Sequence, residues 1–239
     1  AAINALAAAA GLELKVMALD LDRPTADFTA GPAMSEDECL AALSAGAAMV
    51  EPGLDLLLLG EMGIGNSTAA AALAARSFGG TAADWVGPGT GLDAAGIARK
   101  TAVIDAALAA HQDAPHTPFE TLRRVGGREI VAIAGAILAA RRLGIAVLLD
   151  GFIGTAAIAP LAAANPAITA HCLAAHRSAE PGHRRLLDRL GLVPLLGLDM
   201  RLGEASGAAV AALLVRAALA AHDGMATFTE AGIAAAPGD

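Results

Sequence analysis

Two glycine-flanked glutamates are the residues of this sequence best suited to chemistry. Glu61 lies in G-E-M-G-I-G-N-S-T, residues 60–68, and Glu204 lies in L-G-E-A-S-G, residues 202–207. Each follows an apolar run and precedes an alanine-rich helical stretch. The helix dipole favours the anion of Glu204, whereas a carboxylate at the turn of Glu61 costs electrostatic energy unless it has another task, such as handling a proton or a ribose hydroxyl. A base and a helper carboxylate around one phosphorylated ligand would suit group transfer at a sugar carbon.

The segment 60–68 also has the form of an anion site. A strand, a glycine turn and a helix start bring unpaired backbone N–H groups to the positive end of a helix dipole. The spacing nearly fits a P-loop, but Asn66 stands where the lysine should be, which argues against a nucleoside triphosphatase and favours a monophosphate ester. The alternative is a tight turn that binds no ligand.

Two further segments offer cations and a hydroxyl. Lys100 follows the glycine turn that begins at Gly87, and it could supply the cation that Asn66 does not. His176-Arg177-Ser178 places a cation and a hydroxyl after an apolar run, which suits an anionic oxygen. The alternatives are a solvated helix end for Lys100, a helix N-cap for Ser178 and a first-turn residue for Glu204.

Apolar runs of strand length alternate with helix-length stretches along the chain. Continuous apolar runs are typical of parallel strands covered on both faces, so we predict an α/β protein with a doubly wound, mainly parallel, Rossmann-like sheet and a small helical appendage. Ligands of such sheets bind beyond the carboxyl ends of the strands, where Glu61, Asp150, Ser178 and Glu204 would lie. The expected strands are 12–19, 54–59, 145–149, 168–173 and 192–198. The expected helices are 35–50, 66–77, 92–111, 126–143, 153–163 and 181–190, with a further buried helix over 205–221.

Composition excludes several classes of function. The net charge of −8, the 3% aromatic content and the lack of basic clusters argue against nucleic-acid binding. The apolar tracts are shorter than an uninterrupted membrane span, and no secretory signal is visible, which predicts a cytoplasmic protein. The six histidines and two cysteines lack metal-ligand spacing, so we expect no metal.

The motifs, taken together, resemble the nicotinate-nucleotide:dimethylbenzimidazole phosphoribosyltransferase family of cobalamin lower-ligand synthesis. The matching segments include G-E-M-G-I-G-N-S-T, G-T-G-L-D-A-A-G-I-A-R-K, L-L-D-G-F-I, A-H-R-S-A-E-P-G-H and M-R-L-G-E-A-S-G-A, in the order of the family. The resemblance implies transfer of the phosphoribosyl group of nicotinate mononucleotide to dimethylbenzimidazole, with inversion at the anomeric carbon. The products would be α-ribazole 5′-phosphate and nicotinate, and no cofactor would be required.

The resemblance also implies the roles of residues. Glu204 would be the general base, and Glu61 would lie in the same catalytic site. Gly63, Lys100 and Ser178 would surround the phosphate, and Leu202 and Gly203 would line the acceptor side. The full set of implied substrate-binding residues is Gly63, Ile64, Gly65, Asn66, Lys100, Asp150, Ser178, Leu202 and Gly203.

One departure from the family concerns the N-terminal side. Family members carry, before the segment that matches Ala1, a portion with a G-D-H-G-type motif and residues of the benzimidazole pocket, and this sequence lacks them. Two alternatives to the transferase therefore stay open: a truncated, non-catalytic nucleotide-binding module, and a transferase for a different base. We expect a homodimer with a catalytic domain over 1–221 and a C-terminal helical segment of a small domain over 222–239.

Overall fold

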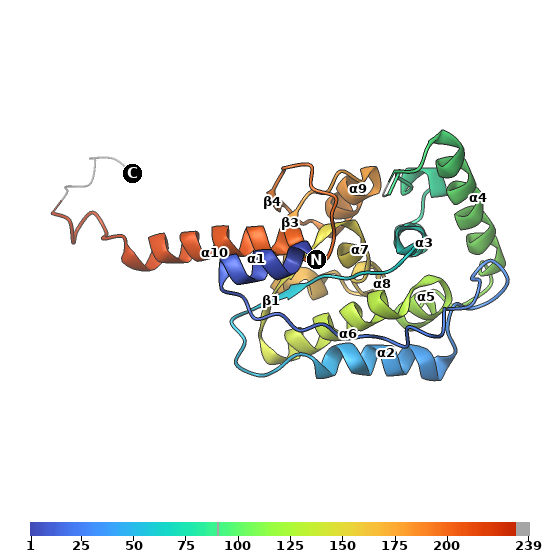
Figure 1. Cartoon of the computed structure of the whole chain (residues 1–239), viewed down its shortest axis with the longest axis horizontal. Helices are drawn as coiled ribbons and strands as arrows, with labels where there is room; N and C mark the ends of the chain where they lie inside the picture. Colours follow the sequence, from blue (N-terminus) through green and yellow to red (C-terminus); the bar gives the residue numbers. More distant parts are fainter. Residues whose placement is uncertain (90, 233–239) are drawn as a thin grey trace.

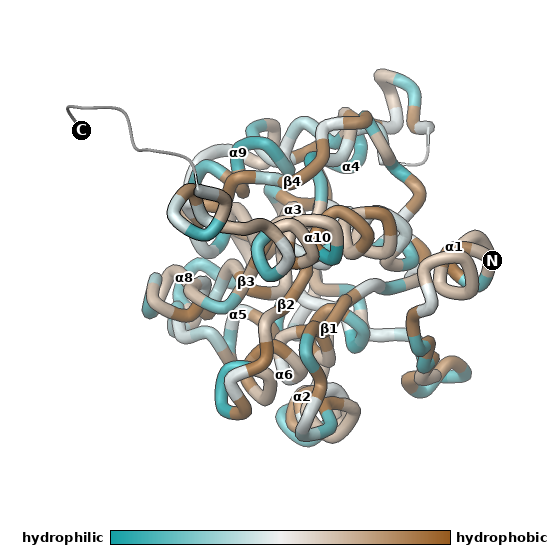
Figure 2. The backbone as a smooth tube through the Cα atoms, turned by 90° about the vertical axis from the view of Figure 1, so that its left-hand side faces the viewer, coloured by the Kyte–Doolittle hydropathy of each residue, from teal (hydrophilic) through white to brown (hydrophobic). Residues whose placement is uncertain are grey.

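A four-stranded parallel sheet forms the centre of the computed structural model, which describes residues 1–89 and 91–232. The strands are β1 (Leu56–Leu59), β2 (Ala146–Leu149), β3 (Cys172–His176) and β4 (Pro194–Leu196). They lie in the sequential order β1-β2-β3-β4, as Figure 2 shows edge-on. The predicted α/β class is confirmed.

Helices cover both faces of the sheet (Figure 1). Alternate residues of a strand point to opposite faces, and β2 shows this clearly: Val147 and Leu149 belong to the larger core, and Leu148 to the smaller one. The larger core is built with α2 (Glu36–Ala48), α3 (Asn66–Phe78), α4 (Ala94–Ala110), α5 (Pro118–Val125), α6 (Arg128–Leu143), α7 (Gly151–Ala156), α8 (Ala159–Ala164), α9 (Pro181–Leu190) and the 3₁₀ helix η1 (Ala82–Asp84). The smaller core is built with α1 (Ala2–Ala10) and α10 (Ser206–Gly224).

Small residues let the helices of the larger core approach closely. The run 69–75 of α3 is buried along its whole length. A Cβ added at Gly46 of α2 would lie 1.8 Å from the carbonyl oxygen of Ala132 in α6, and one at Gly135 of α6 would lie 2.0 Å from that of Leu43. The small residues of this composition therefore allow close backbone contact between neighbouring helices.

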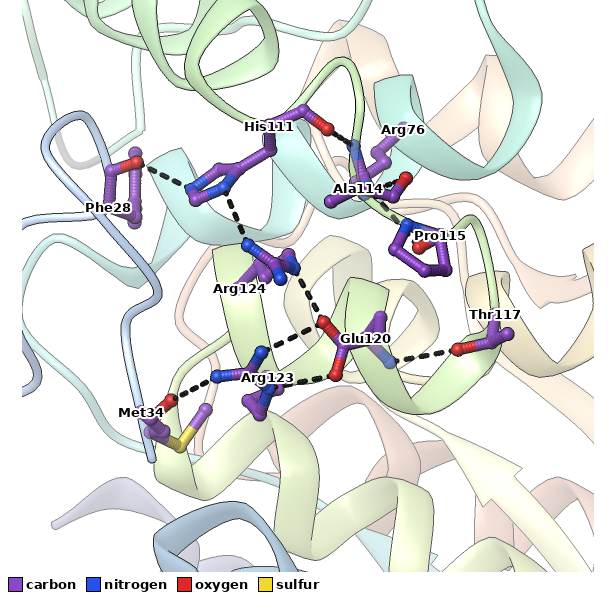
Figure 3. Close-up of polar contacts among 10 residues, drawn as sticks. All are labelled: Phe28, Met34, Arg76, His111, Ala114, Pro115, Thr117, Glu120, Arg123 and Arg124. Carbon is purple, nitrogen blue, oxygen red and sulfur yellow. Dashed lines mark hydrogen bonds and ion pairs between the residues drawn. The ribbon is translucent and has the colours of Figure 1, made fainter. Parts of the chain in front are cut away.

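A polar network holds the far end of α3, opposite Asn66 (Figure 3). Arg76 donates to the carbonyl oxygen of His111 at 2.8 Å, and Glu120 accepts from Arg123 at 2.9 Å and from Arg124 at 2.6 Å. These contacts tie the chain between α4 and α5 to α3. Their partners are backbone carbonyls and a neighbouring carboxylate, so the network has a structural role.

Three predicted elements were wrong in type or extent. The segment 12–19 is not a strand: it makes no ladder with the described strands, and Val16 is 83% exposed. The stretch 168–173 is mostly the 3₁₀ helix η2 (Pro166–His171), because Pro166 and the cap of Asn165 on Ala167 N start a helical turn. The predicted helix over 126–143 matches α6, whereas α5 was not predicted. The stretch 153–163 holds two helices, α7 and α8.

Helix α10 is only partly the buried helix expected over 205–221. Its first turns are buried against the sheet, but Leu213, Leu214 and Leu219 are about half exposed, since the second half of the helix projects beyond the rest of the fold (Figure 1). Among the described helices, α10 alone has the length and hydropathy of a membrane span. The predicted domain boundary at 221/222 falls inside α10, and residues 233–239 lie outside the described residues, so the small C-terminal domain stays a prediction.

Candidate active site

The two glutamates meet at the carboxyl end of the sheet. The backbone N–H of Glu204 donates to the carbonyl oxygen of Glu61 at 3.3 Å. A Cβ added at Gly203 would lie 3.6 Å from Oε1 of Glu61, and one at Gly60 would lie 2.2 Å from the backbone nitrogen of Ala205. The segments after β1 and β4, which are far apart in the sequence, are thus packed against each other through glycines.

The backbone around Glu204 is strained. Glu204 and Ala205 have φ values of 60° and 62°, in the left-handed region that side chains rarely adopt. Such outliers cost of order 1 kcal/mol or more each and cluster at functional sites. Oε2 of Glu204 is buried and has no hydrogen-bond partner among the described residues. The strained backbone therefore carries a carboxylate with one buried oxygen to which the described residues donate no hydrogen bond.

Glu61 lies in a group of acidic residues joined by Asn66. The amide nitrogen of Asn66 donates to Oε2 of Glu61 in a very short contact and to Oε1 of Glu129 at 3.1 Å. Burial raises the pKa of Glu61 from 4.5 to about 7, the hydrogen bond from Asn66 opposes this, and Glu129 and Asp150 raise it further. Asn66 thus donates hydrogen bonds to two carboxylates.

Asp150 anchors the start of α10. Its Oδ1 accepts from the backbone N–H of Ala208 at 2.8 Å and lies 3.4 Å from Nε2 of His176. Asp150 and His176 are both almost fully buried. A Cβ added at Gly207 would lie 2.1 Å from the His176 ring, so a glycine is needed for this close approach. The pair fixes the helix that follows Glu204.

Lys100 and Ser178 lie in a second, more basic part of the site. Nζ of Lys100 donates to Oγ of Ser67 at 2.9 Å and to the carbonyl oxygen of Gly87 at 3.4 Å. Burial lowers the pKa of the Lys100 ammonium, and the charge of Glu180 opposes that effect. A Cβ added at Gly87 would lie 2.2 Å from Oε2 of Glu180, whose backbone N–H donates to Oγ of Ser178 at 3.4 Å.

Ser178 is held by a buried histidine. Nδ1 of His183 accepts from the backbone N–H of Ser178 at 3.0 Å and lies 2.9 Å from its hydroxyl. Nε2 of His183 lies 3.2 Å from the hydroxyl of Thr155. Burial, with a smaller effect from His176, lowers the pKa of His183 to about 3, so this imidazole is neutral. The arrangement sets the position of the loop after β3.

The remaining predicted residues line an open rim. Gly65 has a φ of 79° and caps α3, a position that favours glycine. Ile64 is fully exposed and Leu202 is 59% exposed, so the turn after β1 is accessible. Two surface depressions lie elsewhere, at the other end of α3, lined in common by Ser77 and Ala163.

Several side chains of the site were not predicted. Glu129, Glu180, His183 and Ser67 contact the predicted residues. Ser67, Glu180 and His183 lie in the motifs quoted above, whereas Glu129 lies outside them. Among the described residues, no group of three or more histidine, cysteine, aspartate or glutamate side chains is arranged to hold a metal ion.

Comparison with known proteins places this geometry in a family. A family model described as a phosphoribosyltransferase matches residues 1–233. A protein of Novosphingobium aromaticivorans named nicotinate-nucleotide–dimethylbenzimidazole phosphoribosyltransferase is 73% identical over 234 residues, covering 98% of this chain and 69% of that protein. A protein of the same name from Rhodobacter capsulatus is 58% identical over 235 residues, covering 98% and 70%. The crystal structure of CobT from Thermus thermophilus is similar with a TM-score of 0.88 and 42% identity, covering 99% of this chain and 76% of that one.

Proposed function

The chain belongs to the nicotinate-nucleotide–dimethylbenzimidazole phosphoribosyltransferase family, and we propose that Glu204 and Glu61 carry out the reaction of this enzyme at the rim of the sheet. The protein transfers the phosphoribosyl group of nicotinate mononucleotide to dimethylbenzimidazole, giving α-ribazole 5′-phosphate and nicotinate. The observation that carries the proposed roles is the backbone hydrogen bond that brings the two acidic segments together.

Glu204 is the proposed general base. A nitrogen of dimethylbenzimidazole attacks the anomeric carbon, the bond from that carbon to the pyridinium nitrogen breaks, and its electron pair leaves with nicotinate. The proton of the acceptor N–H passes to Glu204. The buried, unpartnered Oε2 of Glu204 supports this role, because that oxygen has a free site for the incoming proton.

Glu61 is the proposed stabiliser of positive charge. Because the leaving group is already a pyridinium, it departs without an acid, and the sugar gains oxocarbenium character in the transition state. A carboxylate in a partly buried site stabilises such charge more strongly than one in water. The position of Glu61, beside the Glu204 segment and largely withdrawn from solvent, supports this role.

The basic part of the site is the proposed phosphate subsite. Lys100 and Ser178 present an ammonium and a hydroxyl, and Gly65, which has open space where a side chain would be, leaves the start of α3 uncovered. The apolar, exposed Ile64 and Leu202 suit the flat acceptor ring on the other side. Asp150 supports the site indirectly, by fixing the start of α10.

Replacing Glu204 by glutamine tests the assignment of the base. Glu204→Gln should lower turnover by about 10²- to 10⁴-fold, the usual contribution of a positioned base. Binding of nicotinate mononucleotide, measured by calorimetry, should change little. Glu13→Gln, which removes an exposed carboxylate, is the matched control and should behave as the wild type. Normal turnover by Glu204→Gln would exclude this residue as the base.

We also propose that the protein is a cytoplasmic homodimer. The half-exposed leucines of the second half of α10, Leu213, Leu214 and Leu219, support association, because apolar surface of this kind is covered in stable assemblies. Two free, buried cysteines are compatible with a reducing compartment. Light scattering should give twice the chain mass of 23.5 kDa, and cell fractionation should recover the enzyme in the soluble cytoplasmic fraction.

A further inference from the structure

We propose that Glu129 is a positioning residue of the reaction: through the shared amide of Asn66, it sets the conditions under which Glu61 becomes an anion. Glu129 lies in the first turn of α6 and has no assigned role. The inference rests on the role proposed above for Glu61 and adds a residue to it.

The geometry of Asn66 carries the argument. A side-chain amide nitrogen has two hydrogens, and this one faces two carboxylates, those of Glu61 and Glu129. Asn66 is only 9% exposed, so water has little access to the bridge. With both hydrogens occupied, this amide is not free to bind phosphate. Asn66, which stands where a P-loop has its lysine, thus links the side chains of Glu61 and Glu129 by hydrogen bonds.

Gly63 makes room for the bridge. A Cβ at this position would lie 2.6 Å from Oε1 of Glu129 and 2.7 Å from Nδ2 of Asn66. Both contacts are shorter than real Cβ atoms make, so any side chain would push these polar ends aside. The glycine therefore does more than expose backbone N–H groups: it lets Glu129 reach Asn66.

The charges around Glu61 are mostly of one sign. Glu129 acts on it from α6 and Asp150 from the end of β2, and the backbone of Glu204 lies beside it in the segment after β4. No lysine or arginine of residues 1–89 and 91–232 forms an ion pair with Glu61, and His176 is paired with Asp150. Like charges disfavour the ionised form of a carboxyl group. Glu129 therefore helps Glu61 to keep its proton until a cationic ligand arrives.

A bound substrate would reverse this balance. The pyridinium of the nucleotide and the developing charge on its sugar favour an ionised Glu61, which then releases its proton to solvent. Without the charge of Glu129, Glu61 would ionise at lower pH, whether or not substrate is bound. The acid limb of turnover that reports Glu61 would then move to lower pH.

Carboxyl ¹³C NMR of protein labelled in its glutamate side chains measures the titration of Glu61 directly, and Glu61→Gln identifies its signal. In the wild type this signal should titrate near pH 7. In Glu129→Gln its midpoint should fall by about 1 pH unit or more, the usual effect of removing a nearby like charge. The acid limb of kcat should move in the same direction, while the KM for nicotinate mononucleotide changes less than about twofold. Glu36→Gln, which removes an exposed carboxylate from the first turn of α2, is the matched control and should change neither.

An unchanged Glu61 titration in folded Glu129→Gln would overturn the inference. If that variant does not fold, Glu129→Ala provides the second test, because it removes the same charge and leaves the amide of Asn66 beside Glu61, and it should lower the same midpoint; an unchanged midpoint there also overturns the inference. Full activity of Glu61→Gln would instead contradict the role proposed for Glu61. The Glu61 titrations of the wild type and of Glu129→Gln would still test the bridge.

Discussion

The raised pKa of Glu61 predicts that this one residue makes the protein less stable as pH rises. The pKa rises from 4.5 to about 7, chiefly because the side chain is buried. At about 1.4 kcal/mol per pH unit, the rise corresponds to about 3 kcal/mol. The folded state binds the proton more tightly than the unfolded state, so the stabilisation is complete below pH 4.5 and is lost as pH rises towards 7. Glu61→Gln cannot ionise and should not show this loss.

Urea unfolding followed by tryptophan fluorescence gives the required free energies, because Trp85 is the one tryptophan of the chain and is fully buried. Between pH 5 and pH 8, the free energy of unfolding of Glu61→Gln should rise by about 2 to 3 kcal/mol relative to the wild type. Burial lowers the pKa values of His111, His171 and His183, which gives the opposite pH dependence, but these histidines are present in both proteins and cancel in the difference. A difference between the two proteins that does not change with pH would refute the reasoning.

Two further substitutions test the phosphate subsite and the packing beneath the acidic residues. Lys100→Met should weaken binding of nicotinate mononucleotide by about 10- to 100-fold in calorimetry, the loss expected for one charge-assisted contact, whereas Arg99→Met, at an exposed neighbouring position, should bind normally. Equal affinities would remove Lys100 from the subsite. Gly207→Ala should lower the free energy of unfolding by about 2 kcal/mol or more in urea titrations, because its Cβ would lie 2.1 Å from the His176 ring. Gly31→Ala, with open space around it, should be neutral, and a neutral Gly207→Ala would contradict the close packing.

The parts of the fold that depend on local pattern could be predicted from the sequence. The continuous apolar runs before Glu61 and Asp150 indicated β1 and β2, and helix α9 has the predicted bounds, Pro181–Leu190. The rule that parallel strands end at one edge was enough to expect Glu61 and Glu204 near each other. The segment 12–19 shows the limit of this reasoning, because an apolar run becomes a strand only where a neighbouring strand can pair with it.

The contacts that complete the site depend on tertiary structure and left no local signal. Glu129 lies 63 residues from Asn66 along the chain, and a glutamate in the first turn of a helix is ordinary. His183 is equally hidden, since a histidine inside a helix gives no sign that it will meet the Ser178 backbone. The left-handed backbone of Glu204 could not be expected either, because glycine, and not glutamate, is the residue that indicates such a conformation.

We expect the distribution of charge in the site to favour one bound orientation of the nucleotide. Glu61, Glu129 and Glu204 gather around the turn after β1, while Lys100 contacts Ser67 and Gly87 and forms an ion pair with none of these three glutamates. Nicotinate mononucleotide carries a cation at its pyridinium ring and an anion at its phosphate, so it fits this arrangement in one direction and is repelled in the other. The repulsion among the carboxylates in the free enzyme is relieved when the cationic end enters. The repulsion returns when the bond to the sugar breaks and the pyridinium becomes a neutral ring. The acidic group then also repels the carboxylate of nicotinate, which favours release of that product.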